Sequence, residues 1–148
     1  MGLEGAVGLT DVLIGRAELG DVLQKWGRTE LHVLPAGRIP PNPSELLGSR
    51  AMVTVLGELA SRFDFVLVDA PPLLPVTDAA VLSKLTGGAI VIAAAGRTKR
   101  QELASALRSL DHIGSNVLGI VMTMLPTKGP DSYGYGSYGS YYGASETR

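Results

Sequence analysis

The chain has 148 residues, enough for one compact domain with a core of moderate size and too few for two ordinary domains. Thirteen Lys and Arg against fourteen Asp and Glu leave a formal charge of −1, which excludes the basic excess typical of a general nucleic-acid-binding protein. Because there is no Cys, a disulfide framework, a thiolate zinc site and a cysteine nucleophile are excluded. A content of 45% hydrophobic and 5% aromatic residues indicates an α/β domain with an aliphatic core.

Nothing in the sequence resembles a targeting or membrane segment. The longest purely apolar run, 89–95, is far shorter than the roughly 18 to 20 residues that a membrane helix needs. The first residues contain neither the basic region of a signal peptide nor a myristoylation signal. We therefore expect a cytoplasmic protein.

The first part of the chain predicts mainly helix. Two short helical stretches, 9–14 and 19–26, are followed by an apolar run, 31–34, that is typical of a strand. A longer helix is predicted over 43–62, with Asn42 as its N-cap. Its apolar positions share one helical stripe, which we expect to face the core: Leu46, Val53, Leu56, Ala60 and Phe63.

The second part alternates strands and helices. The runs 65–68, 89–94 and 117–124 have the continuous hydrophobicity of buried parallel strands. Helical spacing between them predicts helices over 77–85 and 98–112. Strands and helices that alternate through short connections indicate a doubly wound, mainly parallel α/β sheet.

The composition changes after residue 126 to Gly, Ser and Tyr. We therefore expect an α/β domain over 1–126 and a disordered tail over 127–148. Such a tail could carry a phenol into the active site of another molecule and be phosphorylated there, or it could be a low-complexity linker that associates weakly. All five tyrosines of the chain lie in it: Tyr133, Tyr135, Tyr138, Tyr141 and Tyr142.

The first candidate for chemistry is Asp69. In open α/β sheets, ligands bind beyond the carboxyl ends of the strands, and Asp69 directly follows the apolar run 65–68. Two prolines, Pro71 and Pro72, then end the strand. A carboxylate presented in this way can hold magnesium beside nucleotide phosphates, as a Walker B aspartate does. The alternative is an ordinary turn or cap residue.

Two further candidates lie close to the starts of the next two predicted helices. Asp78 is a second candidate catalytic carboxylate, although the helix macrodipole favours an acidic residue there whatever the function. Arg97 follows the run 89–94, where a cation could meet a phosphate, or could simply be solvated. A complete nucleotide site would also need the phosphate loop G-x-x-x-x-G-K-[ST], and no Gly-Lys pair occurs in the sequence.

Together these features resemble the cytoplasmic catalytic domain of bacterial tyrosine autokinases (BY-kinases) that control capsule and exopolysaccharide synthesis. These kinases are relatives of the deviant Walker P-loop ATPases. The resemblance extends over nearly the whole chain. It is carried by these segments in this order: Gly8–Leu13, Val33–Gly37, Pro40–Leu47, Phe63–Asp78 and the terminal tyrosine cluster.

The resemblance implies ATP and Mg²⁺ as ligands, with Asp69 at the metal and the tail tyrosines as autophosphorylation sites between subunits. It also implies a homo-oligomer and a membrane adaptor that determines polysaccharide chain length and recruits the kinase to the inner face of the membrane. The family's adenine-binding Asn after the last strand corresponds to Thr123, which with Arg97 is the predicted nucleotide-binding pair.

The family's phosphate loop lies upstream of the segment that matches Gly8, so the chain resembles the carboxyl-terminal portion of the domain. We therefore expect the isolated chain to be inactive and prone to aggregation, because unpaired strands would be exposed. Two alternatives stay open. The chain could be a non-enzymatic phospho-acceptor or interaction module, or a fragment of a partition-type ATPase.

Overall fold

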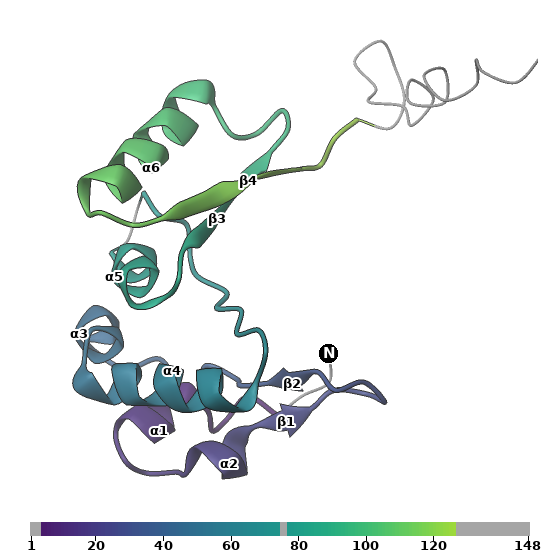
Figure 1. The fold of residues 1–148 in the computed structure, drawn as a ribbon, viewed down its shortest axis with the longest axis vertical. Coiled ribbons are helices and arrows are strands. Elements are labelled where there is room, and N and C mark those ends of the chain that lie inside the picture. The colour runs from purple at the N-terminus through teal and green to yellow at the C-terminus, as the bar shows by residue number, and fades with distance from the viewer. Residues whose placement is uncertain (1–3, 75–76, 127–148) are drawn as a thin grey trace, which may run out of the picture.

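The computed structural model describes residues 4–74 and 77–126. Figure 1 shows two halves, of which the first holds α1 to α4 with β1 and β2, and the second holds α5, α6, β3 and β4. An extended segment, residues 64–74, leaves the first half, and we call it the connector. The elements in chain order are α1 (Leu9–Leu13), α2 (Leu19–Val22), β1 (Gln24–Lys25), β2 (His32–Val33), α3 (Pro43–Leu47), α4 (Arg50–Arg62), α5 (Asp78–Leu85), β3 (Ala89–Ala94), α6 (Arg100–His112) and β4 (Val117–Thr123).

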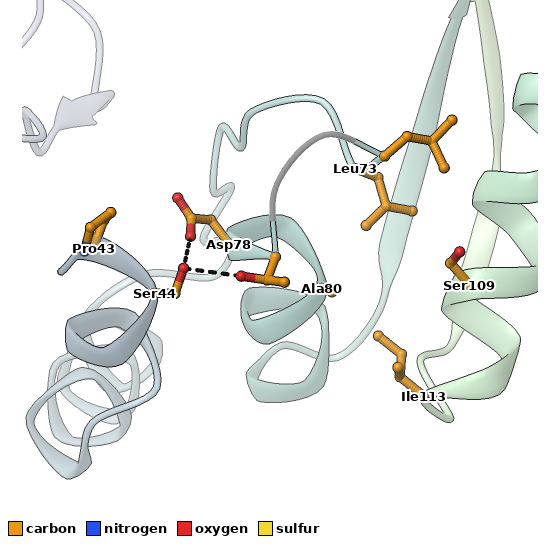
Figure 2. A pocket seen from close by; sticks show the side chains of 9 residues that line it. Pro43, Ser44, Leu73, Asp78, Ala80, Ser109 and Ile113 are labelled. Atoms are coloured by element: carbon orange, nitrogen blue, oxygen red, sulfur yellow. Dashed lines mark hydrogen bonds between the residues drawn. The ribbon is translucent and has the colours of Figure 1, made fainter.

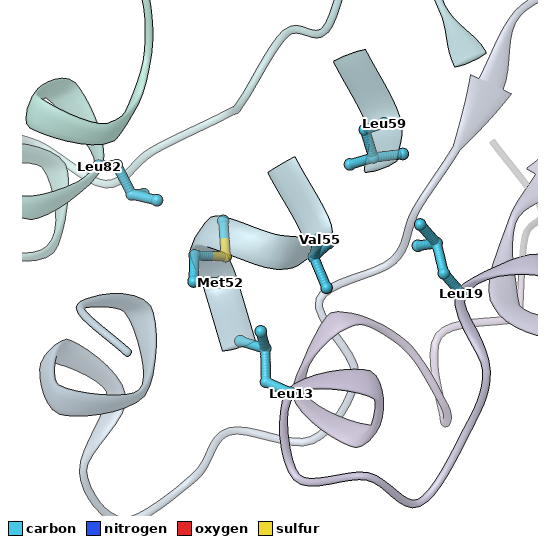
Figure 3. Packing of buried hydrophobic residues seen from close by; sticks show 6 residues of the cluster. All are labelled: Leu13, Leu19, Met52, Val55, Leu59 and Leu82. Atoms are coloured by element: carbon cyan, nitrogen blue, oxygen red, sulfur yellow. The ribbon is translucent and has the colours of Figure 1, made fainter. Parts of the chain in front are cut away.

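Helix α4 is at the centre of the core. Three of its apolar residues follow one another at intervals of three and four, so they share one face of the helix. Helices α1, α2 and α5 each add a leucine to this face (Figure 3). The buried cluster consists of Leu13, Leu19, Met52, Val55, Leu59 and Leu82. Because Leu82 lies on α5, this cluster also joins the two halves.

The helix predicted over 43–62 is two helices, because the chain breaks at Gly48 and Ser49. The Ser49 hydroxyl caps α4 by accepting the backbone N–H of Met52 at 3.3 Å. The predicted stripe was wrong within α4 itself, because the face that turns to the core is one position earlier and holds Met52, Val55 and Leu59. Val53 and Ala60, both predicted to face the core, are exposed.

A close backbone approach holds the start of α1. The N–H groups of Leu9 and Thr10 donate to the carbonyls of Pro35 and Ala36 at 2.8 and 3.0 Å. Gly8 permits this approach, since a Cβ there would lie 2.1 Å from the Pro35 carbonyl oxygen. This contact connects the segments 8–13 and 33–37.

The strands form two separate pairs. β1 and β2 are antiparallel, so the strand predicted over 31–34 is shorter than expected and belongs to a small hairpin. β3 and β4 are parallel, with Ile92 opposite Val121, and α6 connects them and packs against β4. The strands predicted over 89–94 and 117–124 and the helices over 77–85 and 98–112 are thus confirmed to within two residues at each end.

The predicted strand 65–68 is wrong for this structure, and the predicted sheet is present only as the parallel pair β3–β4. A strand needs neighbours for its backbone N–H and C=O groups, and no described segment makes backbone hydrogen bonds to 65–68. The connector is therefore extended but unpaired. Two of its apolar side chains lie in solvent, with Phe65 88% and Leu67 87% exposed, whereas Val66 packs against the core cluster.

One face of the β3–β4 pair is also uncovered. Ile90, Ile92 and Val121 point to the same side of the pair, and all three are exposed. On the other side Ala93 is buried, as are Ala106 and Leu110 of α6. In the described part of the chain, no helix has the length and apolar character needed to cross a membrane.

The close approach at Gly8 predicts a position-specific effect of added side-chain volume. Gly8→Ala should lower the free energy of unfolding by about 1–3 kcal/mol, because the new methyl group must displace backbone. Gly57→Ala is the control, since a Cβ on that α4 glycine meets nothing within 4 Å, and it should stabilise by roughly 0.5–1 kcal/mol. Urea unfolding measures both, and equal effects of the two substitutions would contradict the close approach.

The uncovered apolar face predicts self-association of the isolated chain. Light scattering should show a mass that grows with concentration, and the hydrophobic dye ANS should bind. The double substitution Ile90→Thr with Ile92→Thr should reduce both signals, because it makes the exposed face more polar. The fold should survive, since both side chains are exposed and little packing is lost. Val91→Thr, on the half-buried side, should destabilise the fold without reducing dye binding. A monomeric chain that binds no dye would disprove the prediction.

Candidate functional site

Two predicted site residues lie at the carboxyl end of the β3–β4 pair. Thr123 is the last residue of β4, and its carbonyl accepts the N–H of Ala95, the residue after β3, at 2.9 Å. Arg97 lies two residues farther along this turn and is exposed. The structure therefore brings Arg97 and Thr123 to one edge, as the parallel arrangement requires.

The turn that carries Arg97 is closed by its own backbone and one hydroxyl. The Thr98 hydroxyl accepts the Ala94 N–H at 2.9 Å, and the Thr98 N–H donates to the Ala94 carbonyl at 2.9 Å. Gly96 has a φ of +71°, a left-handed conformation that suits glycine. Arg97 and the two cations that follow, Lys99 and Arg100, are all exposed, so this turn presents positive charge at the end of the sheet. Sequence reasoning missed Thr98, although a Gly followed by a nearby hydroxyl is a turn signal.

Asp69 lies in the connector, away from any strand end. Its side chain is exposed, and within residues 4–74 and 77–126 it makes no hydrogen bond or ion pair. Across the same residues, no three His, Asp or Glu side chains gather into a group that could hold a metal ion. Mg²⁺ commonly uses only one or two carboxylates together with water and substrate phosphates. Asp69 therefore fits one ligand of such a site, whereas the residues that would hold the phosphates are not among those described.

Asp78 is engaged by another helix. It is the first residue of α5, and its Oδ1 accepts a hydrogen bond from the hydroxyl of Ser44 on α3 (Figure 2). The Ser44 hydroxyl also lies 3.0 Å from that of Thr77. Sequence reasoning missed Ser44 as a partner, because its spacing from Asp78 carries no local signal.

A cavity of about 520 Å³ adjoins this contact. It is open to solvent and lies between α3, the end of the connector, α5 and α6 (Figure 2). Neither Asp69 nor the Arg97–Thr123 edge lines it, so it is separate from the predicted nucleotide site. Its lining is Pro43, Ser44, Leu73, Leu74, Thr77, Asp78, Ala80, Ser109 and Ile113.

The predicted acceptor tyrosines, Tyr133, Tyr135, Tyr138, Tyr141 and Tyr142, lie outside the described residues. The site residues within the described part fall into three places. Arg97 and Thr123 share the edge of the β3–β4 pair, Asp78 contacts Ser44, and Asp69 stands alone on the connector.

Comparison with known proteins identifies what the chain resembles. No family model matches it. It is 36% identical over 133 residues to the tyrosine-protein kinase YwqD of Bacillus subtilis, covering 90% of this chain and 56% of that protein. It is 35% identical over 133 residues to the tyrosine-protein kinase CpsD of Streptococcus agalactiae, covering 89% of this chain and 58% of that protein.

The solved structures that the chain resembles are also tyrosine kinase domains. The kinase domain of the Escherichia coli tyrosine kinase ETK aligns with a TM-score of 0.76 and 34% identity, covering 90% of this chain and 53% of that one. The VpsO kinase domain aligns with a TM-score of 0.80 and 28% identity, covering 84% of this chain and 62% of that one. The chain thus spans little more than half the length of these relatives. Over most of its length the chain is homologous to bacterial tyrosine-protein kinases.

Proposed function

We propose that the chain is the carboxyl-terminal portion of a tyrosine autokinase domain that regulates capsule or exopolysaccharide synthesis. The observation that carries this proposal is the joint sequence and structural likeness to kinase domains over about nine tenths of the chain. In the proposed reaction the complete domain transfers the γ-phosphoryl group of ATP to tyrosines of its own tail. Transfer of this kind relies on positioning and on neutralisation of charge.

The proposed roles of the residues follow from their positions. Arg97 and Thr123 share one edge of the sheet, where a cation and a hydroxyl can contact a nucleotide. Asp69 would hold Mg²⁺, which would neutralise phosphate charge when bound. The exposed, unpartnered state of Asp69 supports this role, because no described contact has to be broken for the carboxylate to bind a metal.

Partners and location belong to the same proposal. One related solved structure is the chimerical protein CapA2B2, which aligns with a TM-score of 0.80 and 32% identity. We propose a membrane adaptor as the activator and place the kinase in the cytoplasm at the inner face of the membrane. The uncovered apolar face of β3–β4 supports homo-oligomer formation or burial in a larger domain.

A second function, that of a phospho-acceptor, is favoured by two observations on the sequence. All five tyrosines lie in the last sixteen residues, and the sequence contains no Gly-Lys pair. A chain of this kind would be a substrate for a complete kinase rather than an enzyme. Both functions use the tyrosines of the same tail. Only the kinase function requires Asp69 as a metal ligand.

A chimera tests the first function. The amino-terminal part of a complete relative, which precedes the matching segment, is fused in front of this chain. Autophosphorylation should appear, and Asp69→Asn should slow it by about 100-fold or more, because metal-bound charge stabilisation is worth several kcal/mol. Asp64→Asn, an exposed carboxylate on the same connector, is the matched control and should retain the rate. An Asp69→Asn chimera as active as its parent would refute the metal role.

Phosphotyrosine detection on the chain itself tests the acceptor role. With ATP and Mg²⁺ alone the chain should show no phosphotyrosine, and addition of a complete relative should label its tail. A variant with all five tyrosines changed to Phe should remain unlabelled. Strong labelling without the relative would contradict the proposal that this chain alone cannot transfer phosphate because it lacks the phosphate loop. An unlabelled chain in its presence would rule out the acceptor function.

A further inference from the structure

The Ser44–Asp78 contact joins two helices that are distant in sequence. Ser44 is the second residue of α3 and Asp78 the first residue of α5, thirty-four positions apart. Both side chains are half-buried where α3 packs against α5 (Figure 2). A hydroxyl that donates to a carboxylate makes a charge-assisted hydrogen bond, which is about twice as strong as a neutral one. The contact is therefore strong enough to influence how the two helices are placed.

Thr77 shows that the contact with Ser44 takes the place of the usual N-cap hydrogen bond of α5. Thr77 is the N-cap residue of α5, and threonine at this position usually accepts an N–H from its own helix. Its side chain makes no such bond and lies 3.0 Å from the Ser44 hydroxyl instead. Two successive residues at the start of α5 thus direct their polar groups to a single serine of α3.

The contact also holds the helix that comes next in the chain after the connector. The connector makes no backbone hydrogen bonds among the described residues, so its course depends on where it is attached. At its start, Phe63, which precedes it, and its own residue Val66 pack against the core cluster. At its far side, α5 is held by Leu82 in the core and by Asp78 on Ser44.

We infer that Ser44 and Asp78 are a positioning pair, in which the Ser44 hydroxyl holds the Asp78 carboxylate and sets the start of α5. Asp78, which the sequence predicts as a catalytic carboxylate, thereby takes part in placing the start of α5. The inference concerns the placement of α5 relative to α3 and does not rest on the proposed function. The contact itself can be tested without ATP.

Hydrogen exchange of the α5 amides, measured by mass spectrometry on the full chain at low micromolar concentration, provides the test. Ser44→Ala should speed exchange in residues 78–85 by about ten-fold, because a hydrogen bond to a charged group is lost. Ser44→Thr retains the hydroxyl and should exchange at the wild-type rate. Ser61→Ala is the matched control, since that hydroxyl bonds only the Glu58 carbonyl of its own helix.

A double-mutant comparison separates pairing from a simple helix-dipole effect of Asp78. If the two residues act as a pair, Asp78→Ala should add little to the faster exchange of Ser44→Ala. Asp78→Asn, which keeps an acceptor oxygen, should exchange more slowly than Asp78→Ala. Full additivity of Ser44→Ala and Asp78→Ala would overturn the inference. Faster exchange in Ser44→Thr would also overturn it, even if Ser44→Ala fails to fold. Neither result depends on kinase activity, so the proposed function stands or falls separately.

Discussion

The backbone of a β-strand must be hydrogen-bonded by a neighbour, and the rest of this structure depends on where that requirement is met. β3 and β4 meet it for each other, and α6 covers one of their faces. The run 65–68 is at least as apolar as β3, yet no described segment pairs with it, so it lies extended with Phe65 and Leu67 in solvent. Hydrophobic composition alone does not make a strand.

The same requirement governs the candidate site. Arg97 and Thr123 are positioned by the β3–β4 pair and therefore share one edge. Asp69 follows an unpaired run, so nothing in the described chain directs its carboxylate toward that edge. Under the proposed function, a further strand that pairs with 65–68 would supply the partner that this run lacks among the described residues. Such pairing fits the exposed apolar face of β3–β4.

Outside the sheet, the two halves are held by a few specific contacts. The core around Met52 and Leu82 supplies non-directional burial, which tolerates small rotations between helices. The Ser44–Asp78 hydrogen bond is directional, and it defines the start of α5. Within the first half, the approach of Gly8 to the Pro35 carbonyl has a similar role, because it leaves no room for a side chain.

Local patterns in the sequence were sufficient for the α/β class, the helices α5 and α6, and the strands β3 and β4, because periodicity and capping act over a few residues. They also indicated the resemblance to tyrosine kinases, which the comparisons confirmed. Only the tertiary structure decided that residues 43–62 form two helices, that 65–68 is unpaired, and that Asp78 contacts Ser44. The last two depend on a partner far away in the chain, and no local spacing specifies which residue that partner is. The first depends on a local cap, because the Ser49 hydroxyl accepts the Met52 N–H and starts a new helix.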